Sequence, residues 1–258
     1  MLDMRDVFQK YAEIYDALYS NKDYSFETDY LFALLGDLSG KSMLDIGCGT
    51  GRYAEEFAGR NVNVHGIDLS PEMINVANKR RSILATPTKE NLTYQVGDAR
   101  NFKSEQSYDV VCSLFHVINY QLSDEDLISF FSTAHDALKP GGVLVFDFWF
   151  GPGVLSDKPA LREKTISQDL LEITRIATPT IFSSNNRVDV KYDVTIRSSQ
   201  GDLLEKSFSE THSMRYLFES DLQSLSGKFF KVEKLYAWES WSIPNEDNWS
   251  AVCVMIKI

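Results

Sequence analysis

Short apolar runs alternate with amphipathic stretches over residues 43–150 of the chain. The apolar runs have the length of buried strands, and the stretches between them have the spacing of helices that pack one face on a core. Ser70 followed by Pro71 is typical of a helix start. This alternation predicts an α/β unit. The expected strands are 43–46, 62–69, Leu92–Val96, Tyr108–Leu114 and Val143–Phe150, and the expected helices are Arg52–Arg60, one that starts after Ser70, and Asp124–Leu138.

The pattern changes after Phe150, where Gly151-Pro152-Gly153 is expected to break the chain. β-rich runs follow, and residues 188–197 alternate almost strictly, as in a sheet with one solvent-exposed face. A short helix is expected at Glu219–Ser226. The strands predicted in this part are Leu170–Phe182, Val188–Ser198, Leu203–Phe218, Val232–Ser240 and Ala251–Lys257. We interpret the first three as an antiparallel insertion between the fifth strand and a closing pair of strands.

A glycine-rich segment, Asp45-Ile46-Gly47-Cys48-Gly49-Thr50-Gly51, ends the first strand. Glycine lets the backbone approach a ligand where a Cβ atom would collide. The dinucleotide fingerprint G-x-G-x-x-G would need a third glycine at the position of Arg52. The carboxylate of Asp45 also repels a pyrophosphate but suits a ligand with an ammonium and a sulfonium. The loop therefore favours S-adenosylmethionine over NAD, while an NAD-dependent dehydrogenase stays an open alternative.

Acidic residues close the next two strands. Asp68 lies 17 residues beyond Gly51, a spacing that places its carboxylate at the neighbouring strand tip, where it can accept from both ribose hydroxyls. Asp98 follows the third strand and could accept from an adenine amino group. Taken singly, each acid could equally cap a helix or turn, and Met73 fits a core position as well as a ligand contact. Their combination with the glycine loop favours a cofactor site.

Five segments in this order resemble the class I S-adenosylmethionine-dependent methyltransferases: LDIGCGTG, GIDLSPEM, GDAR, YDVVCSLF and LKPGG. The resemblance implies a Rossmann-like, seven-stranded sheet flanked by helices and closed by an antiparallel hairpin. It also implies a set of cofactor contacts. Asp45, Gly47 and Gly49 would hold the methionine part, with Cys48 as a small filler of the same loop; Asp68 would hold the ribose; Leu69 and Met73 would flank the adenine; Asp98 and Ala99 would bind its edge; and Leu114 would close the pocket floor.

Tyr11, Tyr15 and Tyr19 lie four residues apart, on one face of an expected helix over residues 11–19. An amphipathic helix that packs its aromatic side chains on the core would show the same pattern. The stretch YDALYSNKDY, however, resembles the N-terminal cover of the amino-sugar N-methyltransferases of deoxysugar pathways, which folds over the bound cofactor. On this resemblance Tyr15 and Tyr24 contact the methionine end, with Tyr11 and Tyr19 as further candidates.

A sulfonium already makes its methyl group a ready electrophile, so positioning and desolvation supply most of the rate. A base is needed only to remove a proton from an ammonium or a hydroxyl. The loop after the fourth strand faces the transferred methyl group, which makes His116 the first candidate base and Tyr120 the second. A hydrogen-bonded wall residue is the alternative for His116. The resemblance favours Tyr120 as a substrate contact, and Asp147 could hold an amine.

The composition argues against several classes of binding partner. The net charge of −11 argues against a nucleic-acid substrate, since phosphate binding needs a basic face. The residues show no metal-ligand spacing, and three scattered cysteines indicate reduced thiols in the cytoplasm. No apolar run approaches the roughly 18 residues that cross a bilayer. We therefore expect a cytoplasmic protein with a small-molecule substrate and no metal, nucleic acid or membrane partner. The insertion can cap the acceptor site, form a homodimer contact, or both.

Three parts are predicted: a cofactor-binding core with a helical cover over 1–150, the β-rich insertion over 151–218, and a closing helix and hairpin over 219–258. The predicted function is methyl transfer from S-adenosyl-L-methionine, which leaves S-adenosyl-L-homocysteine, to a small polar metabolite such as the amine or hydroxyl of a sugar or sugar nucleotide. A glycine- or other small-amine N-methyltransferase fits nearly as well. A protein that binds the cofactor without catalysis is an alternative of another class.

A sugar nucleotide would need cations for its phosphates. Basic side chains are available in the insertion, although solvated strand faces account for most of them: Arg162, Lys164, Arg175, Arg187, Lys191 and Arg215. The amino-sugar enzymes carry an arginine in a glycine-rich turn before the last strand. This chain has Asn245-Glu246-Asp247-Asn248-Trp249 there, which is acidic and lacks glycine. The departure weakens the sugar-nucleotide hypothesis.

Overall fold

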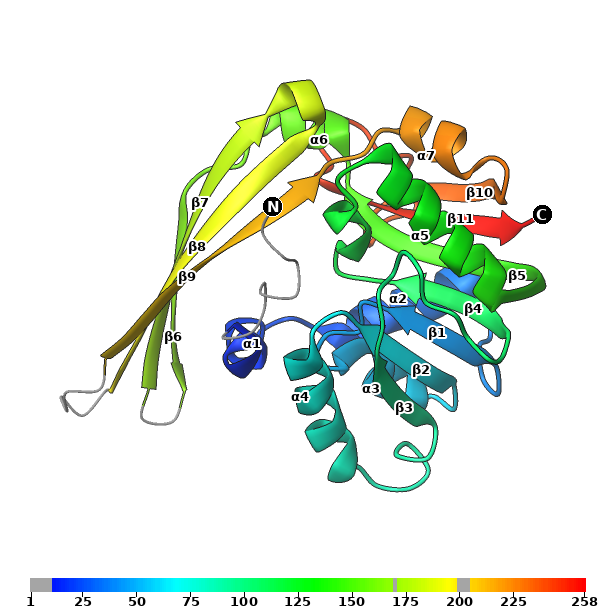
Figure 1. Cartoon of the computed structure of the whole chain (residues 1–258), viewed down its shortest axis with the longest axis horizontal. Helices are drawn as coiled ribbons and strands as arrows, with labels where there is room; N and C mark the ends of the chain where they lie inside the picture. The colour runs from blue at the N-terminus through cyan, green and yellow to red at the C-terminus, as the bar shows by residue number, and fades with distance from the viewer. Residues whose placement is uncertain (1–10, 169–170, 199–204) are drawn as a thin grey trace.

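The computed structural model describes residues 11–168, 171–198 and 205–258, which build two β-sheets (Figure 1). The larger sheet has seven strands in the order β10-β11-β5-β4-β1-β2-β3. Strands β1 to β5 run parallel, whereas β11 pairs antiparallel with both β5 and β10. This arrangement confirms the predicted α/β sheet with its closing antiparallel pair. The strands are β1 (Ser42–Ile46), β2 (Asn63–Asp68), β3 (Leu92–Val96), β4 (Tyr108–Ser113), β5 (Leu138–Trp149), β10 (Phe230–Ala237) and β11 (Ser250–Lys257).

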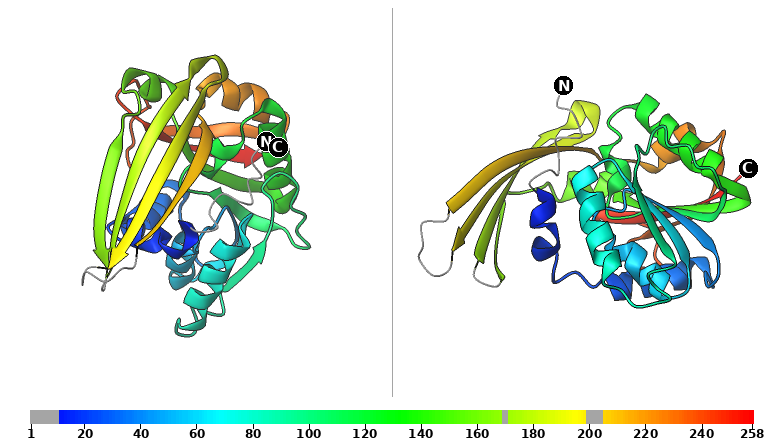
Figure 2. Two further views of the ribbon diagram at one scale, coloured as in Figure 1. Left: turned by 60° about the vertical axis from the view of Figure 1, so that its left-hand side comes forward. Right: turned by 60° about the horizontal axis from the view of Figure 1, so that its bottom comes forward.

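Helices cover both faces of this sheet, and each face has its own apolar core (Figures 1 and 2). One core joins the sheet to α2 and α3 through buried residues such as Leu31 and Phe57. The other joins it to α5 and α7 through residues such as Phe130 and Leu222. α4 lies beside β2 and β3. The helices are α2 (Tyr24–Leu35), α3 (Arg52–Gly59), α4 (Pro71–Ser82), α5 (Asp124–Ala137) and α7 (Glu219–Ser226).

The smaller sheet is the insertion. It is antiparallel throughout, in the order β6-β7-β8-β9, and it arches away from the core over the short helix α1 (Tyr15–Leu18) (Figure 2). Residues 11–19 form the opening segment of the described chain. Its buried side chains and those of β7 and β8 form one apolar cluster, which includes Leu18, Ile173 and Val194. The opening segment is therefore packed against the insertion. The strands are β6 (Arg162–Gln168), β7 (Leu171–Phe182), β8 (Arg187–Ser198) and β9 (Glu205–Arg215).

Three elements differ from what the sequence predicted. β6 was missed, because an edge strand of sequence REKTISQ has no apolar alternation to reveal it. The segment from Gly151 does not merely break the chain but forms the helix α6 (Gly151–Ser156), in which Pro152 occupies a first-turn position that suits it. The expected helix over 11–19 is divided into the 3₁₀ turn η1 (Tyr11–Glu13) and the single α-helical turn α1.

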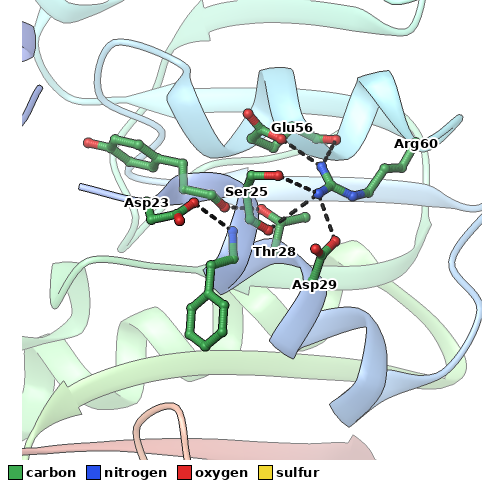
Figure 3. A network of polar contacts seen from close by, with 8 residues as sticks. Asp23, Ser25, Thr28, Asp29, Glu56 and Arg60 are labelled. Atoms are coloured by element: carbon green, nitrogen blue, oxygen red, sulfur yellow. Dashed lines mark hydrogen bonds and ion pairs between the residues drawn. The ribbon is translucent and has the colours of Figure 1, made fainter. Parts of the chain in front are cut away.

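Polar contacts fix the start of α2 against the end of α3 (Figure 3). The guanidinium of Arg60 donates to the backbone and hydroxyl oxygens of Ser25 and, at 2.7 Å, to the carboxylate of Asp29. It also donates to Glu56 within its own helix. Asp23 caps α2 by accepting from the amide of Phe26 at 2.9 Å. These contacts hold the first turn of α2, which carries Tyr24, in a fixed position.

The turn after β1 depends on Gly47, whose φ is +77°. Its amide and that of Cys48 donate to the carbonyl of Ile67 and so join the turn to β2. A Cβ atom at position 47 would lie 2.4 Å from a methyl carbon of Val117. Both the backbone conformation and this contact therefore require glycine.

We expect Gly47→Ala to lower the free energy of unfolding by ~2–5 kcal/mol, because the substitution adds positive-φ strain to a steric overlap. Gly59→Ala is the matched control: it lies in α3, and its Cβ atom would meet nothing within 4 Å. That control should be as stable as the wild type or more stable by up to about 1 kcal/mol. Urea denaturation measures both, and equal stabilities of the two variants would contradict the steric argument.

Candidate functional site

A cavity of about 390 Å³ lies at the carboxyl ends of the parallel strands, where the strand order reverses between β1 and β4. Open α/β sheets bind their ligands at such a switch point. The opening segment and the insertion supply side chains to the other side of its lining. Two of the predicted contacts, Asp45 and Asp147, lie outside its lining. The other predicted cofactor and catalytic residues all line it, namely Tyr11, Tyr15, Tyr19, Tyr24, Gly47, Cys48, Gly49, Asp68, Leu69, Met73, Asp98, Ala99, Leu114, His116 and Tyr120.

Asp68 organises one end of this cavity. Its two carboxylate oxygens accept from the amides of Gly49 and Ser70, each at 2.9 Å, so one side chain fixes both the glycine loop and the start of α4. Burial raises the pKa of Asp68, and the two amide donors oppose that rise. Ser70 caps α4 by accepting from the amide of Met73, as predicted. A carboxylate held in this way keeps lone pairs for further donors from a ligand.

Asp98 lines the same end but is already engaged. It accepts from the backbone amide of Arg100 at 2.9 Å and from the guanidinium of that residue at 2.7 and 3.0 Å. Burial raises the pKa of Asp98, but the hydrogen bonds from Arg100 outweigh it and leave the pKa below its ordinary value. Arg100 also donates to the carboxylate of Asp126 at 3.2 Å, on the first turn of α5. The contact of Asp98 with an adenine amino group stays a prediction.

Asp45 lies beneath the loop, outside the cavity lining, with an exposed fraction of 2%. One oxygen accepts from the thiol of Cys112 at 3.5 Å, and the other has no hydrogen-bond partner among the described residues. Burial raises the pKa of Asp45 to about 7, with a smaller contribution from Asp68. Asp45 is thus a buried acid behind the glycine loop. Its contact with the methionine part of the cofactor stays a prediction.

Asp16 joins the opening segment to the glycine loop and to α4. No sequence motif had indicated this residue. Its carboxylate accepts from the hydroxyl of Thr50 at 2.7 Å and forms an ion pair with Arg80 of α4. Arg80 also donates to the carbonyl of Thr50 at 3.2 Å. These contacts place Tyr15 and Tyr19, whose rings lie 4.8 Å apart, over the cavity.

A second missed group surrounds Glu27. This acid is 6% exposed, forms an ion pair with Lys22, and accepts from the hydroxyl of Tyr53. The ammonium of Lys22 lies 4.6 Å from the centre of the Phe115 ring and 5.5 Å from that of Tyr24. Tyr24, Tyr53 and Phe115 all line the cavity. The Lys-Asp-Tyr stretch was the available signal, but it did not reveal the partner Glu27.

His116 lies where backbone strain is concentrated. Both Phe115 and His116 have positive φ, at +66° and +65°, which is uncommon for residues other than glycine. The amide of His116 donates to one oxygen of Asp147 at 3.1 Å, and its Nδ1 lies 2.7 Å from the other without the alignment of a hydrogen bond. Asp147 itself is 2% exposed. A buried carboxylate therefore faces the imidazole of His116 across the cavity wall.

Tyr120 forms a hydrogen bond with a residue of the insertion. Its hydroxyl lies 2.8 Å from Nδ1 of His212 on β9, and Nε2 of His212 lies 3.6 Å from the carboxylate of Glu210. Burial raises the pKa of Tyr120, and burial lowers that of His212 although Glu210 raises it. His212, Tyr192 and Met214 line the cavity and were all missed, because inward positions of a β insertion have no motif. Only their period-two spacing could have indicated them.

The donor set fits S-adenosylmethionine. A Cβ atom at Gly49 would meet no protein atom within 4 Å, so the cavity-facing backbone there can lie against a ligand. Asp68 presents a carboxylate at the strand tip, and Met73 and Leu69 present apolar surface. Tyr15 and Tyr24 line the same cavity as the glycine loop. The cavity also extends well past this end, toward the aromatic walls supplied by the insertion. Such a site can hold a donor and an acceptor side by side.

Comparisons with known proteins agree with this geometry. Residues 43–142 match the family described as methyltransferase domain. The chain is 27% identical over 188 residues to dTDP-3-amino-3,4,6-trideoxy-alpha-D-glucopyranose N,N-dimethyltransferase of Streptomyces venezuelae, a match that covers 71% of this chain and 76% of that protein. It is 26% identical over 199 residues to dTDP-4-amino-2,3,4,6-tetradeoxy-D-glucose N,N-dimethyltransferase of Saccharopolyspora spinosa, covering 76% of each.

Among solved structures, DesVI of Streptomyces venezuelae superposes with a TM-score of 0.77 at 22% identity, over 96% of this chain and 98% of that one. The fold is therefore that of the class I methyltransferases. Residues 43–142 are a methyltransferase domain, and the chain is a methyltransferase. In the described part of the chain, no helix has both the length and the hydrophobicity of a membrane span.

The buried acid beneath the loop gives a pH-dependent prediction. The pKa of Asp45 is about 7 in the folded protein, against an ordinary value of 3.8. Between these values the folded state binds a proton that the unfolded state has lost, so this group makes stability fall as the pH rises. Asp45→Asn should remove that fall and make the cofactor-free protein more stable at about pH 8, by on the order of 1–4 kcal/mol, but not at about pH 4. Thermal unfolding of both proteins across this range measures the difference, and parallel curves would contradict it.

Asp68→Ala should weaken binding of S-adenosylhomocysteine at least ~100-fold, because it removes the expected ribose acceptor and frees the amides of Gly49 and Ser70. Glu72→Ala is the control, since Glu72 lies in the same turn but does not line the cavity. Calorimetric titration measures both affinities. Unchanged affinity in Asp68→Ala would remove Asp68 from the cofactor site.

Proposed function

We propose that this methyltransferase transfers a methyl group to the amine of a small polar acceptor, and that the acceptor is an amino sugar. The observation that carries the proposal is the strained turn at Phe115 and His116, which sets an imidazole on the cavity wall against the buried Asp147. Strain of this kind is retained where a side chain must point in one direction. The names of the compared enzymes from Streptomyces venezuelae and Saccharopolyspora spinosa, both amino-sugar N,N-dimethyltransferases, support the same acceptor class.

The reaction needs few catalytic groups from the protein. S-adenosylmethionine supplies an electrophilic methyl group when it is bound. An amine reaches the site largely as an ammonium and must lose a proton before its lone pair can attack. His116 is placed to accept that proton, since the carboxylate of Asp147 stabilises the resulting imidazolium. Tyr15 and Tyr19 exclude water above the cavity, and the glycine loop with Asp68 orients the donor.

Tyr120 serves the acceptor in this proposal. Its raised pKa keeps the phenol neutral, so its hydroxyl can exchange hydrogen bonds with a substrate while His212 fixes its direction. Trp149, Tyr192 and Trp249 line the same cavity, and their rings suit an acceptor ring whose edges carry hydroxyls and whose faces carry C–H groups. A deoxygenated amino sugar has that character.

The remaining expectations about partners belong to the same proposal. A net charge of −11 supports a small-molecule acceptor over a nucleic acid. The cysteines Cys48, Cys112 and Cys253 are free and buried, which supports a reducing compartment such as the cytoplasm. Pairing of two copies through the insertion is a further proposal, which light scattering on the purified protein tests.

The acceptor class is tested with S-adenosylmethionine and a panel of amines, in which free and nucleotide-linked amino sugars stand beside glycine and other small amines. Mass spectrometry should detect a methyl group on the nitrogen of an amino sugar. Methylation of glycine alone, or of a sugar hydroxyl, would replace the proposal by one of the alternatives. Turnover of no acceptor despite tight cofactor binding would favour a non-catalytic role.

His116→Ala should lower kcat by more than ~10-fold, the usual scale for loss of a general base, with the affinity for S-adenosylhomocysteine unchanged. His135→Ala is the matched control, because His135 lies on α5 outside the cavity lining. Steady-state kinetics with the acceptor found in the panel give kcat for both variants. An unchanged kcat in His116→Ala would reduce His116 to a wall residue.

A further inference from the structure

The opening segment is held on its two sides by contacts of different kinds. Figure 1 shows α1 between the strands of the insertion and α4. Toward the insertion, Leu18 packs in one apolar cluster with Ile173 and Val194, and all three side chains are buried. Arg175 and Lys164 add hydrogen bonds on that side. Toward α4 and the glycine loop, the contact is an ion pair with hydrogen bonds around it. A single substitution can therefore break the second side and leave the first intact.

Arg80 of α4 is the centre of this polar contact. Its guanidinium forms an ion pair with Asp16, donates to the carbonyl of Thr50 at 3.2 Å, and lies 3.3 Å from the carboxylate of Glu55 on α3. The hydroxyl of Thr50 donates to the other carboxylate oxygen of Asp16 at 2.7 Å. One side chain thus joins the opening segment to the glycine loop, to α3 and to α4.

These polar groups border the cavity without forming most of its wall. Thr50 and the adjacent Gly49 line the cavity, whereas Asp16, Arg80 and Glu55 do not. The side chains of Asp16 and Arg80 are 35% and 19% exposed, so water and salt reach the ion pair. The pair can therefore be broken without loss of a direct contact to a ligand in the cavity.

The opening segment contributes aromatic rings to the cavity lining. Tyr11, Tyr15 and Tyr19 line the same cavity as the glycine loop. The ring centres of Tyr15 and Tyr19 lie 6.5 and 5.0 Å from that of Phe115, edge to face. Segments that cover a site and are held by few polar contacts commonly open and close to exchange a ligand. The ion pair of Asp16 is the charged contact that this segment makes with the core.

We propose that the ion pair between Asp16 and Arg80 is a latch on the opening segment, and that its opening admits S-adenosylmethionine and releases S-adenosylhomocysteine. The apolar contacts keep the segment on the insertion, so it opens on the side of α4. The hydroxyl of Thr50 couples the latch to the glycine loop. Because the latch concerns the donor end of the cavity, it does not depend on which acceptor is methylated.

A latch differs from a ligand contact in its kinetics. Loss of a ligand contact raises the dissociation rate constant and leaves the association rate constant nearly unchanged, so the affinity falls. Loss of a latch lowers a barrier that entry and exit share. Both rate constants then rise, and the affinity changes little.

Stopped-flow mixing of the full chain with S-adenosylhomocysteine measures both rate constants. The signal is the fluorescence of Trp149 and Trp249, which line the cavity. Plotted against ligand concentration, the observed rate gives the association rate constant as its slope and the dissociation rate constant as its intercept. Arg80→Met should raise both at least ~10-fold and change Kd by less than ~3-fold.

A conservative variant and a double variant test whether the two residues act as one contact. Asp16→Asn keeps an acceptor for the hydroxyl of Thr50, so it should raise both rate constants by a smaller factor. Asp16→Asn combined with Arg80→Met should exchange ligand no faster than Arg80→Met alone. Arg81→Met is the matched control: Arg81 lies one residue further along α4, donates to the carbonyl of Lys89 and does not line the cavity. Its rate constants should stay within ~2-fold of those of the wild type.

Salt gives a test that needs no folded variant. Raising the NaCl concentration from about 0.05 M to about 0.5 M should speed both steps in the wild type and leave Arg80→Met nearly unchanged, because salt screens the exposed pair. Unchanged rate constants in Arg80→Met would overturn the latch, and so would an equal acceleration in Arg81→Met. A fall in affinity with an unchanged association rate constant would overturn it as well, since Arg80 would then stabilise only the bound state. Thermal unfolding of each variant reports its folding.

Discussion

Two backbone amides, those of Gly49 and Ser70, point at the single carboxylate of Asp68, and the site is arranged around this contact. The first amide belongs to the loop after β1, and the second belongs to the turn that begins α4. One half-buried acid therefore sets the distance between two loops that both line the cavity. If the two loops moved apart, an amide or the carboxylate of Asp68 would lose its hydrogen-bond partner.

The two ends of the cavity are built on different principles. The donor end uses backbone groups and short side chains at the ends of parallel strands, where positions vary little because hydrogen-bonded neighbours fix them on both sides. The acceptor end uses long aromatic side chains from the opening segment, from the turn after β4 and from the insertion. Contacts there come from segments distant in the chain, such as Tyr120 with His212. A common donor chemistry is thus combined with an acceptor wall that can differ from one relative to another.

Much of the donor end could be predicted from the sequence, since its signals are local. Strand β3 and helix α7 have the expected bounds, and Ser70 caps its helix as expected. The acceptor end could not be predicted in the same way. Nothing near Tyr120 in the sequence indicates His212, and nothing near Glu27 indicates Tyr53, because both contacts depend on how separate elements pack. The strand β6 escaped prediction for a related reason: an edge strand that buries little leaves little periodicity.

The opening segment contacts both sheets at once. Asp16 holds it to Thr50 and Arg80 of the core, while Tyr11 and Tyr19 hold it to Arg175 of the insertion. The insertion is therefore not a self-contained module, although it looks like one in the ribbon (Figure 2). An engineer who grafted residues 151–218 onto another methyltransferase would leave the inner partners of Arg175 behind. Residues 11–19 would have to travel with the graft, and recombination among relatives would face the same linkage between two stretches far apart in the gene.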